Sequence, residues 1–360
     1  MPSVQRSRSD GGEPAGMDTA TTLNAADFTH LQGALEALPE AGGAIYLPTG
    51  EYHVTETAVK ALPEKQHLFL YGDGRGSVLV NDNTDGQPLL RLVGVVGSWW
   101  PDLKITVRDL TFVGNHASGD ALIMDYPNDA LVDACAFTGH GGAALRLGPQ
   151  GTNVTVRDCW MRDCRHALRA ENIHHLSFHG NQTRSLQDGQ EQAEHVFLGW
   201  ECREVRIVSN HLAYGHAQAI ILDGTAQHVI ANNTIEGFAV GIEARGKGET
   251  NPPDHCRDIV ISGNYLHADT GVLLQGQCRG FAITGNTFIN NPVAAVKAVA
   301  AATGGAHAIT GNVIRKSVYD GEYVRTASRE QGGIELGEAP GCVVTGNVLD
   351  GVTNPGSGPD

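Results

Sequence analysis

One short phrase recurs seven times along this chain. Each copy is a β-prone run closed by a small residue and an asparagine, and these asparagines are Asn181, Asn210, Asn233, Asn264, Asn286, Asn312 and Asn347. The gaps between them run from 22 to 35 residues, and no helical pattern intervenes. A repeat of this length predicts one turn of a solenoid per copy. The fold we expect is an all-β, single-stranded parallel β-helix.

The asparagine has a physical reason to recur at one place in every coil. A bend between two strands leaves backbone groups that no strand can pair, and an amide side chain can bond the bends above and below it. A glycine beside it permits the left-handed backbone of a tight bend. Cys135 and Cys159 also fall at one place in consecutive coils. We expect them to stack in the core as free thiols.

A second short strand precedes each phrase and sets which side chains face the core. Alternation within these strands predicts one inward row: Leu168, Ile220, Ile242, Val272, Val296 and Ile334. The positions between them form two rows on an outward, solvent-facing strand face. The first is Arg146, Arg169, Ile221, Glu243, Leu273, Lys297 and Glu335, and the second is Gly148, Glu171, Asp223, Arg245, Gln275, Val299 and Gly337.

Composition limits the partners of the chain. Lys and Arg total 25 against 40 Asp and Glu, and this net charge of −15 argues against a nucleic-acid partner. The same charge disfavours a polyanionic glycan bound without metal. No apolar stretch approaches the length of about 18 residues that a membrane span needs, and no signal core is visible. Seven cysteines without a CxxC pair favour a reducing, cytoplasmic location over disulfides or zinc.

The chain divides into three expected parts. Residues 1–20 suggest a disordered tail, residues 21–352 a β-helix domain and residues 353–360 a loose C-terminal tail. Helical periodicity over residues 27–38, with Phe28, Leu31, Leu35 and Leu38 on one side, predicts a helix that caps the N-terminal end. No equivalent cap is visible at the other end. We therefore expect a homo-oligomer in which a neighbouring subunit covers it.

The helical cap, the GGAIYLPTGEY segment at 42–52 and the asparagine coils resemble the pectate lyase-like superfamily of right-handed parallel β-helices. The resemblance spans residues 25–352. It implies a right-handed coil, a carbohydrate-binding cleft on the outward strand face and, by analogy with members of the superfamily, a trimer. It selects no single function, because this fold hosts lyases, hydrolases, epimerases, transferases and non-catalytic proteins.

Four inserts, at 93–102, 185–194, 246–255 and 317–331, flank the outward face. Insertions in solenoids collect on the binding side, so they predict a cleft there. Trp99 and Trp100 lie on the first insert, and flat aromatic faces suit sugar rings. The alternative is that they pack the insert onto the solenoid. His195, His211 and His216 surround the second insert and offer a candidate catalytic base.

One set of residues resembles the four marks of polygalacturonase-type glycoside hydrolases. The chain has Asn83-Thr84-Asp85, Gly119-Asp120, Gly139-His140-Gly141 and Arg169-Ala170-Glu171 in the order of that family. The resemblance implies acid/base carboxylates at Asp85 and Asp120, with His140 and Arg169 assisting or binding sugar. The family's paired aspartate is a single residue here, and Glu171 stands where the family has lysine. Chance recurrence of such tripeptides stays open.

A second set comprises Asp223, Glu243 and Arg245, joined by Glu171, Glu201 and Trp200. Asp223 and Glu243 fall on neighbouring coils in different rows, which places their Cα atoms roughly 8 Å apart. Two carboxylates at that separation can act about a glycosidic bond as acid and as base or nucleophile. Arg245 beside Asp223 favours the ionised carboxylate and can orient a substrate. The alternative is a solvated ion pair of little energetic weight.

The expected function is cleavage or transfer of a glycosidic bond by acid/base carboxylates, without a cofactor. The substrate would be an oligosaccharide or a carbohydrate-like small molecule. The main alternative is a uronic-acid lyase or C5-epimerase, which neutralises a carboxylate with Ca²⁺ or Arg and abstracts the adjacent proton. Lys297 and Arg245 face the cleft for that chemistry, although the vWiDH and RxPxxR patterns of pectate lyases are absent. An isomerase or cyclase of a small metabolite and a non-catalytic glycan-binding β-helix also stay open.

Overall fold

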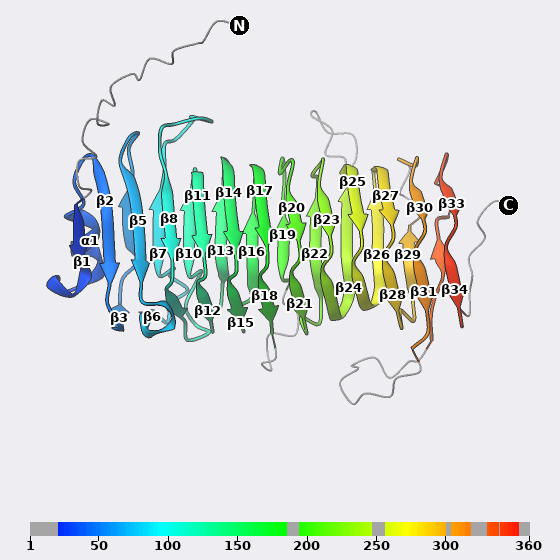
Figure 1. The fold of residues 1–360 in the computed structure, drawn as a ribbon, viewed down its shortest axis with the longest axis horizontal. Coiled ribbons are helices and arrows are strands. Elements are labelled where there is room, and N and C mark those ends of the chain that lie inside the picture. Colours follow the sequence, from blue (N-terminus) through cyan, green and yellow to red (C-terminus); the bar gives the residue numbers. More distant parts are fainter. Residues whose placement is uncertain are drawn as a thin grey trace, which may run out of the picture.

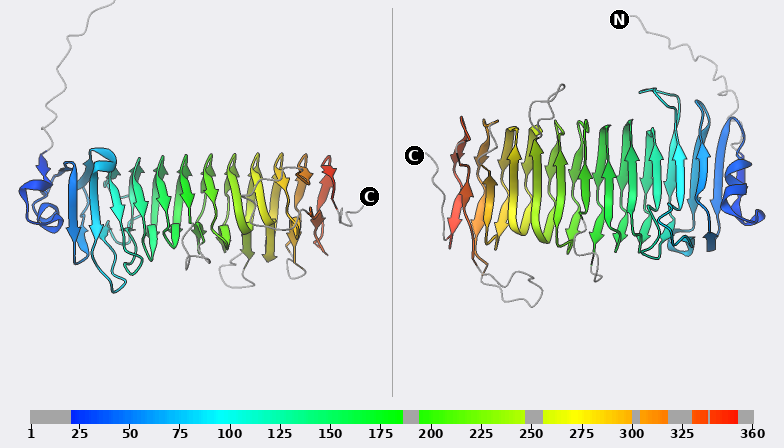
Figure 2. Two further views of the ribbon diagram at one scale, coloured as in Figure 1. Left: turned by 90° about the horizontal axis from the view of Figure 1, so that it is seen from below. Right: turned by 180° about the vertical axis from the view of Figure 1, so that it is seen from behind.

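The computed structural model describes residues 21–185, 194–246, 256–299, 304–317, 330–337 and 339–352. These residues wind into one elongated parallel β-helix with a short helix at its N-terminal end (Figure 1 and Figure 2). Each coil contributes strands in turn to three parallel stacks, here called sheets A, B and C. Sheets B and C are two parts of one continuous sheet, because the long strands β24 (Thr234–Gly246) and β26 (Tyr265–Gly276) run through both. The all-β solenoid expected from the sequence is confirmed. The expected tails at 1–20 and 353–360 lie outside the described residues.

Sheet A consists of β1 (Thr22–Asn24), β2 (Gly42–Leu47), β5 (His67–Gly72), β8 (Ile105–Arg108), β11 (Asn128–Asp133), β14 (Gly151–Arg157), β17 (Ile173–His179), β20 (Arg206–Val208), β23 (Val229–Ala231), β25 (Cys256–Ser262), β27 (Cys278–Thr284), β30 (Ala308–Thr310) and β33 (Val343–Thr345). Sheet B consists of β3 (Gly50–Val54), β6 (Ser77–Asn81), β9 (Thr111–Val113), β12 (Ala136–Thr138), β15 (Trp160–Arg162), β18 (Gln182–Arg184), β21 (His211–Ala213), the first parts of β24 (Thr234–Gly246) and β26 (Tyr265–Gly276), β28 (Thr287–Ile289), β31 (Val313–Arg315) and β34 (Val348–Asp350). Sheet C consists of β4 (Ala58–Ala61), β7 (Leu90–Val93), β10 (Leu122–Asp125), β13 (Ala143–Gly148), β16 (His166–Ala170), β19 (Val196–Leu198), β22 (Gln218–Asp223), the second parts of β24 and β26, β29 (Ala294–Ala298) and β32 (Ile334–Glu335).

The asparagine ladder forms at the bend from sheet A to sheet B. Asn210 donates its backbone N–H and its side-chain amide to Oδ1 of Asn233, both at 2.9 Å, and it also donates to the Phe178 carbonyl at 2.9 Å. The other rungs repeat this pattern up to Asn347. The residue before each rung, and before the equivalent Leu110, Cys135 and Cys159 of earlier coils, is left-handed. These residues have φ between 51° and 68° and are Asp109, Ala134, Asp158, Gly180, Ser209, Asn232, Gly263, Gly285, Gly311 and Gly346. The ladder therefore satisfies buried backbone groups that the bend would otherwise leave unpaired.

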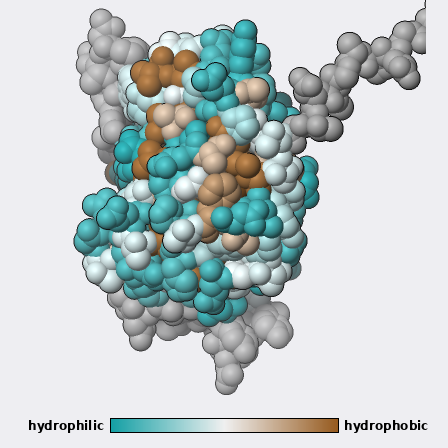
Figure 3. Space-filling view, turned by 90° about the vertical axis from the view of Figure 1, so that its left-hand side faces the viewer, coloured by the Kyte–Doolittle hydropathy of each residue, from teal (hydrophilic) through white to brown (hydrophobic). Residues whose placement is uncertain are grey.

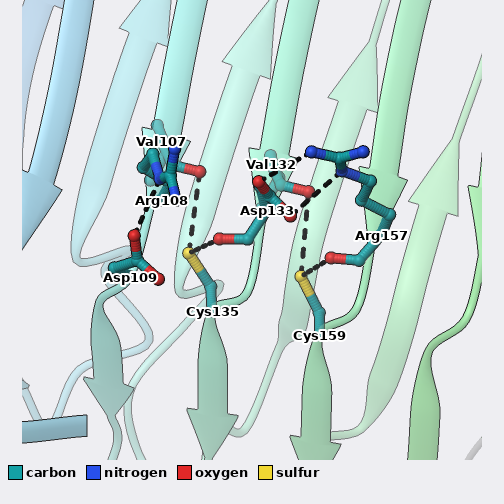
Figure 4. Close-up of polar contacts among 8 residues, drawn as sticks. All are labelled: Val107, Arg108, Asp109, Val132, Asp133, Cys135, Arg157 and Cys159. Atoms are coloured by element: carbon teal, nitrogen blue, oxygen red, sulfur yellow. Dashed lines mark hydrogen bonds and ion pairs between the residues drawn. The ribbon is translucent and has the colours of Figure 1, made fainter. Parts of the chain in front are cut away.

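The two stacked cysteines occupy earlier rungs of the same ladder. The Cys135 thiol lies 3.4 Å from the Asp133 carbonyl, and the Cys159 thiol lies 3.1 Å from the Arg157 carbonyl (Figure 4). The Cys159 N–H donates to Oδ1 of Asn181, which joins the thiols to the amide rungs. Both cysteines are buried and free, as expected.

The N-terminal end is closed by η1 (Ala25–Asp27) and α1 (Leu31–Glu36). The helix is shorter than the expected span of 27–38, because His30 caps its start by accepting the Gly33 N–H and the turn at Ala37 precedes Pro39. Leu31, Leu35 and Leu38 are buried against the first coil. This end of the molecule presents a largely hydrophilic surface with scattered hydrophobic patches (Figure 3). No helix in the described part of the chain is long and apolar enough to span a membrane.

The last described coil differs from the capped end. Val343 of β33 and Val348 and Leu349 of β34 are exposed large hydrophobic residues. These strands have neighbours on one side only within the described residues. The homo-oligomer expected to cover this end stays a prediction.

Candidate functional site

Sheet C has the predicted register, with one coil added. The expected inward residues Leu168, Ile220 and Ile242 are fully buried, and Arg146 stands beside Arg169 as predicted. However, β19 places Phe197 between Arg169 and Ile221, a coil that the sequence pattern had omitted. The Arg169 guanidinium lies 4.5 Å from the centre of the Phe197 ring. An aromatic residue thus ends the stack of arginines.

A groove of about 500 Å³ lies on sheet C beside β10, β13 and β16. Charged side chains dominate its wall, and the glycines and the proline of the β13 region open it. The lining residues are Asp120, Asp125, Gly141, Gly142, Arg146, Leu147, Gly148, Pro149, Arg165, His166, Arg169 and Glu171. The structure therefore brings together three of the predicted site residues, Asp120, Arg169 and Glu171.

Asp120 is held in place by its backbone surroundings. One carboxylate oxygen accepts the Ala143 N–H at 2.7 Å, and the other lies 3.1 Å from Nε of Arg146. A Cβ on Gly142 would approach the Asp120 carboxylate to 2.5 Å. Gly142 is therefore required for this arrangement, which fixes the direction of the Arg146 side chain.

Three arginine–carboxylate pairs follow one another along the groove. Arg91 pairs with Asp125, Arg146 with Asp120, and Arg169 with Glu171 at 3.0 Å. Each arginine has five N–H donors, and such a pair uses only one or two of them. The remaining donors can bind an anionic ligand without breaking the pairs.

Arg165 and His166 complete the wall at the start of β16. Arg165 is exposed and has no ion-pair partner among the residues that the structure describes. Nδ1 of His166 lies 3.1 Å from the Glu194 carbonyl, so this nitrogen carries the proton and Nε2 has the free lone pair. Burial of the ring, which is 13% exposed, lowers the pKa of His166 and keeps it neutral near pH 7.

Sequence reasoning missed Arg165 and His166 as site residues and treated Arg146 only as a member of a row. Arg165 and His166 could have been identified from the sequence, because they directly precede Ala167 and the outward-facing Arg169. The stacking of Arg146 on Arg169 was also visible as a pair of like charges in one outward row. Like charges in adjacent coils repel. Two stacked arginines therefore indicate that carboxylates or an anionic ligand neutralise them, and this was the signal in the sequence.

The second predicted set forms a different structure. Asp223 stands beside Arg245 in register, as predicted, but Arg245 binds Glu243 with two bonds of 2.8 and 2.9 Å. The Glu243 side chain is only 4% exposed, so the expectation that it faces solvent is wrong. The hydrogen bonding to Glu243 raises the pKa of Arg245, and the charges of Glu243, Glu194 and Asp223 add to this shift. Ile221, also expected to be outward and solvent-facing, is fully buried.

His140 and Asp85 do not join the groove wall. His140 is completely buried, and burial lowers its pKa to about 4, so it cannot contact a sugar as the polygalacturonase resemblance implied. Asp85 is exposed in the turn between β6 and β7, where it accepts the Gln87 N–H. His195 is also buried, with a pKa lowered to about 3 by burial, and its Nδ1 bonds the Thr183 hydroxyl.

The predicted aromatic and lysine contacts also lie elsewhere. Trp99 packs against His174 and Trp100 lies near His175, so both rings rest on β17 of sheet A. The alternative, that these tryptophans pack the insert onto the solenoid, is therefore the better description, although Trp100 remains 67% exposed. Trp200 is exposed in the turn after β19, and Lys297 pairs with Glu335 several coils further on. Among the described residues of these inserts, the Ser98 and Pro101 carbonyls accept from Gln150 and Asn128.

Most of the other three inserts lies outside the described residues, so their place beside the groove stays a prediction. Glu201, named with the second set, pairs with Arg203 at 2.6 Å instead. In the described part of the chain, no three His, Cys, Asp or Glu side chains gather as a metal site would need. The groove therefore offers arginines, carboxylates and one neutral imidazole for chemistry.

Comparison with known proteins supports the architecture. A family model described as a right handed beta helix region matches residues 193–314. The A-module of the mannuronan C-5 epimerase AlgE6 from Azotobacter vinelandii has a TM-score of 0.54 at 17% identity, over 91% of this chain and 98% of that one. The Dettilon tailspike protein has a TM-score of 0.64 at 15% identity, over 93% of this chain and 66% of that one. These matches support a right-handed parallel β-helix fold.

One curated relative of this β-helix is the mannuronan C5-epimerase AlgE3 of Azotobacter vinelandii. It is 27% identical over 168 residues, which make up 42% of this chain and 9% of that protein. The β-helix thus matches less than a tenth of the length of this relative.

Proposed function

We propose that this protein acts on an acidic carbohydrate by removing the proton next to a uronate carboxylate. The observation that carries this proposal is the groove, whose wall contains Arg146, Arg165 and Arg169 together with the neutral imidazole of His166. Arginine side chains match carboxylates in geometry and charge. A neutral imidazole is the form of histidine that accepts a proton. The groove therefore provides guanidinium N–H donors for a uronate carboxylate on a chain whose net charge is negative.

The residues divide the first step between them. The arginines bind the uronate carboxylate while the C5–H bond breaks and its proton moves to Nε2 of His166. The electron pair of that bond passes into the carboxylate, where the arginines stabilise the added negative charge. Asp120 and Gly142 act earlier, by fixing the direction of Arg146.

Two outcomes can follow from the same intermediate. Addition of a proton from water to the opposite face of C5, with loss of the His166 proton to solvent, gives the epimer. Breaking of the C4–O bond, with the leaving glycosidic oxygen taking a proton from water, gives elimination instead. The AlgE3 and AlgE6 relatives are named mannuronan C5-epimerases, which supports epimerisation. Hydrolysis needs a carboxylic acid that is free to reach the glycosidic oxygen, but Asp120, Asp125 and Glu171 are each engaged in an ion pair with an arginine. The expected hydrolysis or transfer is untested, and the groove favours it less.

The experiment is incubation with mannuronan in deuterated water, followed by NMR. Epimerisation incorporates deuterium at C5 and changes the sugar's stereochemistry, elimination gives an unsaturated uronate, and hydrolysis gives only new reducing ends. We expect exchange at C5 that is lost in Arg146→Ala and retained in Lys297→Ala. Absence of exchange and elimination on every polyuronide tested, or full activity of Arg146→Ala, would overturn the proposal.

A further inference from the structure

A second hollow, of about 830 Å³, lies on sheet A at the N-terminal end of the molecule, apart from the groove on sheet C. Its wall includes Phe69 of β5, with Thr106 and Arg108 of β8 and Lys104 just before β8. The strand register places Phe69 beside Thr106 and, on its other side, beside the small residue Ala44. The small side chain in β2 contributes to the space over this part of the sheet.

The aromatic residue of this hollow is supported from behind. Phe69 stacks on Tyr71 at 4.6 Å and 14°, and Tyr71 meets the Tyr46 ring at 5.2 Å. The Tyr46 hydroxyl donates to both oxygens of Asp73, at 2.8 and 2.9 Å, and the Thr49 N–H also bonds that carboxylate. Tyr71 is not part of the wall, so it covers one side of Phe69 while the hollow meets another. The ring is thus pre-organised, as a stacking surface for a ligand requires.

The two cations of the wall are available to a ligand. Lys104 is exposed and has no ion-pair partner within the described ranges. Within the described part of the chain, Arg108 pairs through Nε with Asp109 at 2.7 Å, and the neighbouring Asp133 is bound by two 3.0 Å bonds from Arg157 instead (Figure 4). Terminal N–H groups of Arg108 therefore remain for an anion.

We propose that this hollow is a second, non-catalytic carbohydrate-binding site that holds an acidic oligosaccharide. An aromatic face for a sugar ring, a hydroxyl from Thr106 and two cations for carboxylates form a combination that suits uronate units. A nucleic acid would need a larger basic surface than two cations on a chain of net charge −15. The class of ligand rests on the proposed function, but the site itself is independent of the groove. Its role is to raise the local concentration of polymer near the groove.

The test combines binding and turnover with a mannuronate oligosaccharide of defined short length and with the polymer. We expect Phe69→Ala and Lys104→Ala to weaken oligosaccharide binding measured by calorimetry and to raise KM for the polymer by roughly tenfold. Turnover of the short oligosaccharide should stay unchanged. Tyr265→Ala, which removes an exposed aromatic from sheet B, is the matched control, and melting curves check that each variant folds.

Lys104→Ala keeps the test decisive if Phe69→Ala disturbs the stack. Equal binding by both variants and the unaltered protein would overturn the proposal, and so would equal binding of a neutral glucan oligosaccharide. Loss of short-oligosaccharide turnover in properly folded Lys104→Ala would also count against it, because a non-catalytic site cannot cause that. If no polyuronide is turned over but oligouronate binding still depends on Phe69 and Lys104, the proposed function fails while this site stands.

Discussion

Sheet C carries two charged regions on the same strand register, and they differ in access. In the groove, the Arg146 side chain is 46% exposed, whereas Glu243, in the same outward row of a later coil, is 4% exposed. The difference starts with the adjacent outward position. That position is Gly148 beside Arg146, but it is Arg245 beside Glu243, and the Arg245 guanidinium binds Glu243.

This comparison shows that an outward register is necessary for a site on a β-helix but does not make one. Glu243 also stands between Ile221 and Leu273 in its row, so apolar neighbours and an arginine enclose it. Around Arg146, three glycines leave space for a ligand. Glu243, one of the two carboxylates that looked catalytic in the sequence, therefore belongs to a packed ion pair with Arg245. The open region is the one that contains Arg146.

The largest expected effect is on catalysis. Replacing the proposed base by His166→Gln should lower C5 exchange by about 10² to 10⁴-fold, because general-base catalysis typically contributes that much. Glu243→Gln should leave the rate of C5 exchange per folded molecule unchanged. Exchange rates measured by NMR, normalised to folded protein, check both variants. The reverse ranking, with Glu243→Gln the slower enzyme, would move the site to the second region.

The next effect is on stability, and there the order of the two regions should reverse. Glu243→Ala leaves the Arg245 guanidinium without its two charge-assisted bonds and should lower the free energy of unfolding by about 1–3 kcal/mol. Asp120→Ala removes a more exposed pair and should cost less, mainly through the Ala143 N–H. Denaturant unfolding of both variants measures the difference. An equal or larger loss in Asp120→Ala would contradict the distinction between a packed pair and an open groove.

The repeat in the sequence was sufficient to predict the coil, its inward row and the stacked cysteines. It succeeded because each rung meets the same physical demand, a left-handed bend with unpaired backbone groups. The inward prediction for Ile220 and Ile242 held for the same reason, since strand alternation is a local property.

The site was less predictable, because side-chain access depends on neighbours in other coils. Nothing near His140 in the sequence shows that the coil buries it, and Trp99 is adjacent to the expected cleft in sequence but rests on His174 of a later coil. The omitted strand at Phe197 also shifted the assumed neighbours of Arg169 by one coil. The pattern of charges in the sequence gave candidate site residues. Only the packing between coils shows that Arg146 is accessible to a ligand and Glu243 is not.

The third effect is a pH dependence that the groove should show. Because burial lowers the pKa of His166 below its usual 6.5, the base is unprotonated above that pH, and activity should be constant there. Activity should fall as the pH drops through the lowered pKa, by up to about tenfold per pH unit. In His166→Gln this acid limb should disappear from the residual rate. A persistent limb would assign the titration to another group.

Stability has its own acid dependence, which must be measured alongside. Burial lowers the pKa of His195 and His228 to about 3, below their unfolded value of 6.5, so the unfolded chain binds more protons between these limits. Their contribution to stability is complete above pH 6.5 and is lost as the pH falls toward 3. Melting curves over this range separate loss of fold from protonation of His166, and a protein more stable at pH 4 than at pH 7 would contradict the assignment.

The smallest expected effect is that of metal removal. In the proposed chemistry, Arg146, Arg165 and Arg169 neutralise the uronate carboxylate, which is the task that calcium would perform in the lyase alternative considered from sequence. Dialysis against a chelator should therefore leave C5 exchange within about twofold of its starting rate, whereas Arg146→Ala loses far more than the twofold limit. The comparison is informative because both treatments remove positive charge from the same carboxylate. If chelation abolished exchange and calcium restored it, the arginines alone would not be the neutralising groups, and the carboxylates along the groove would become candidate ligands.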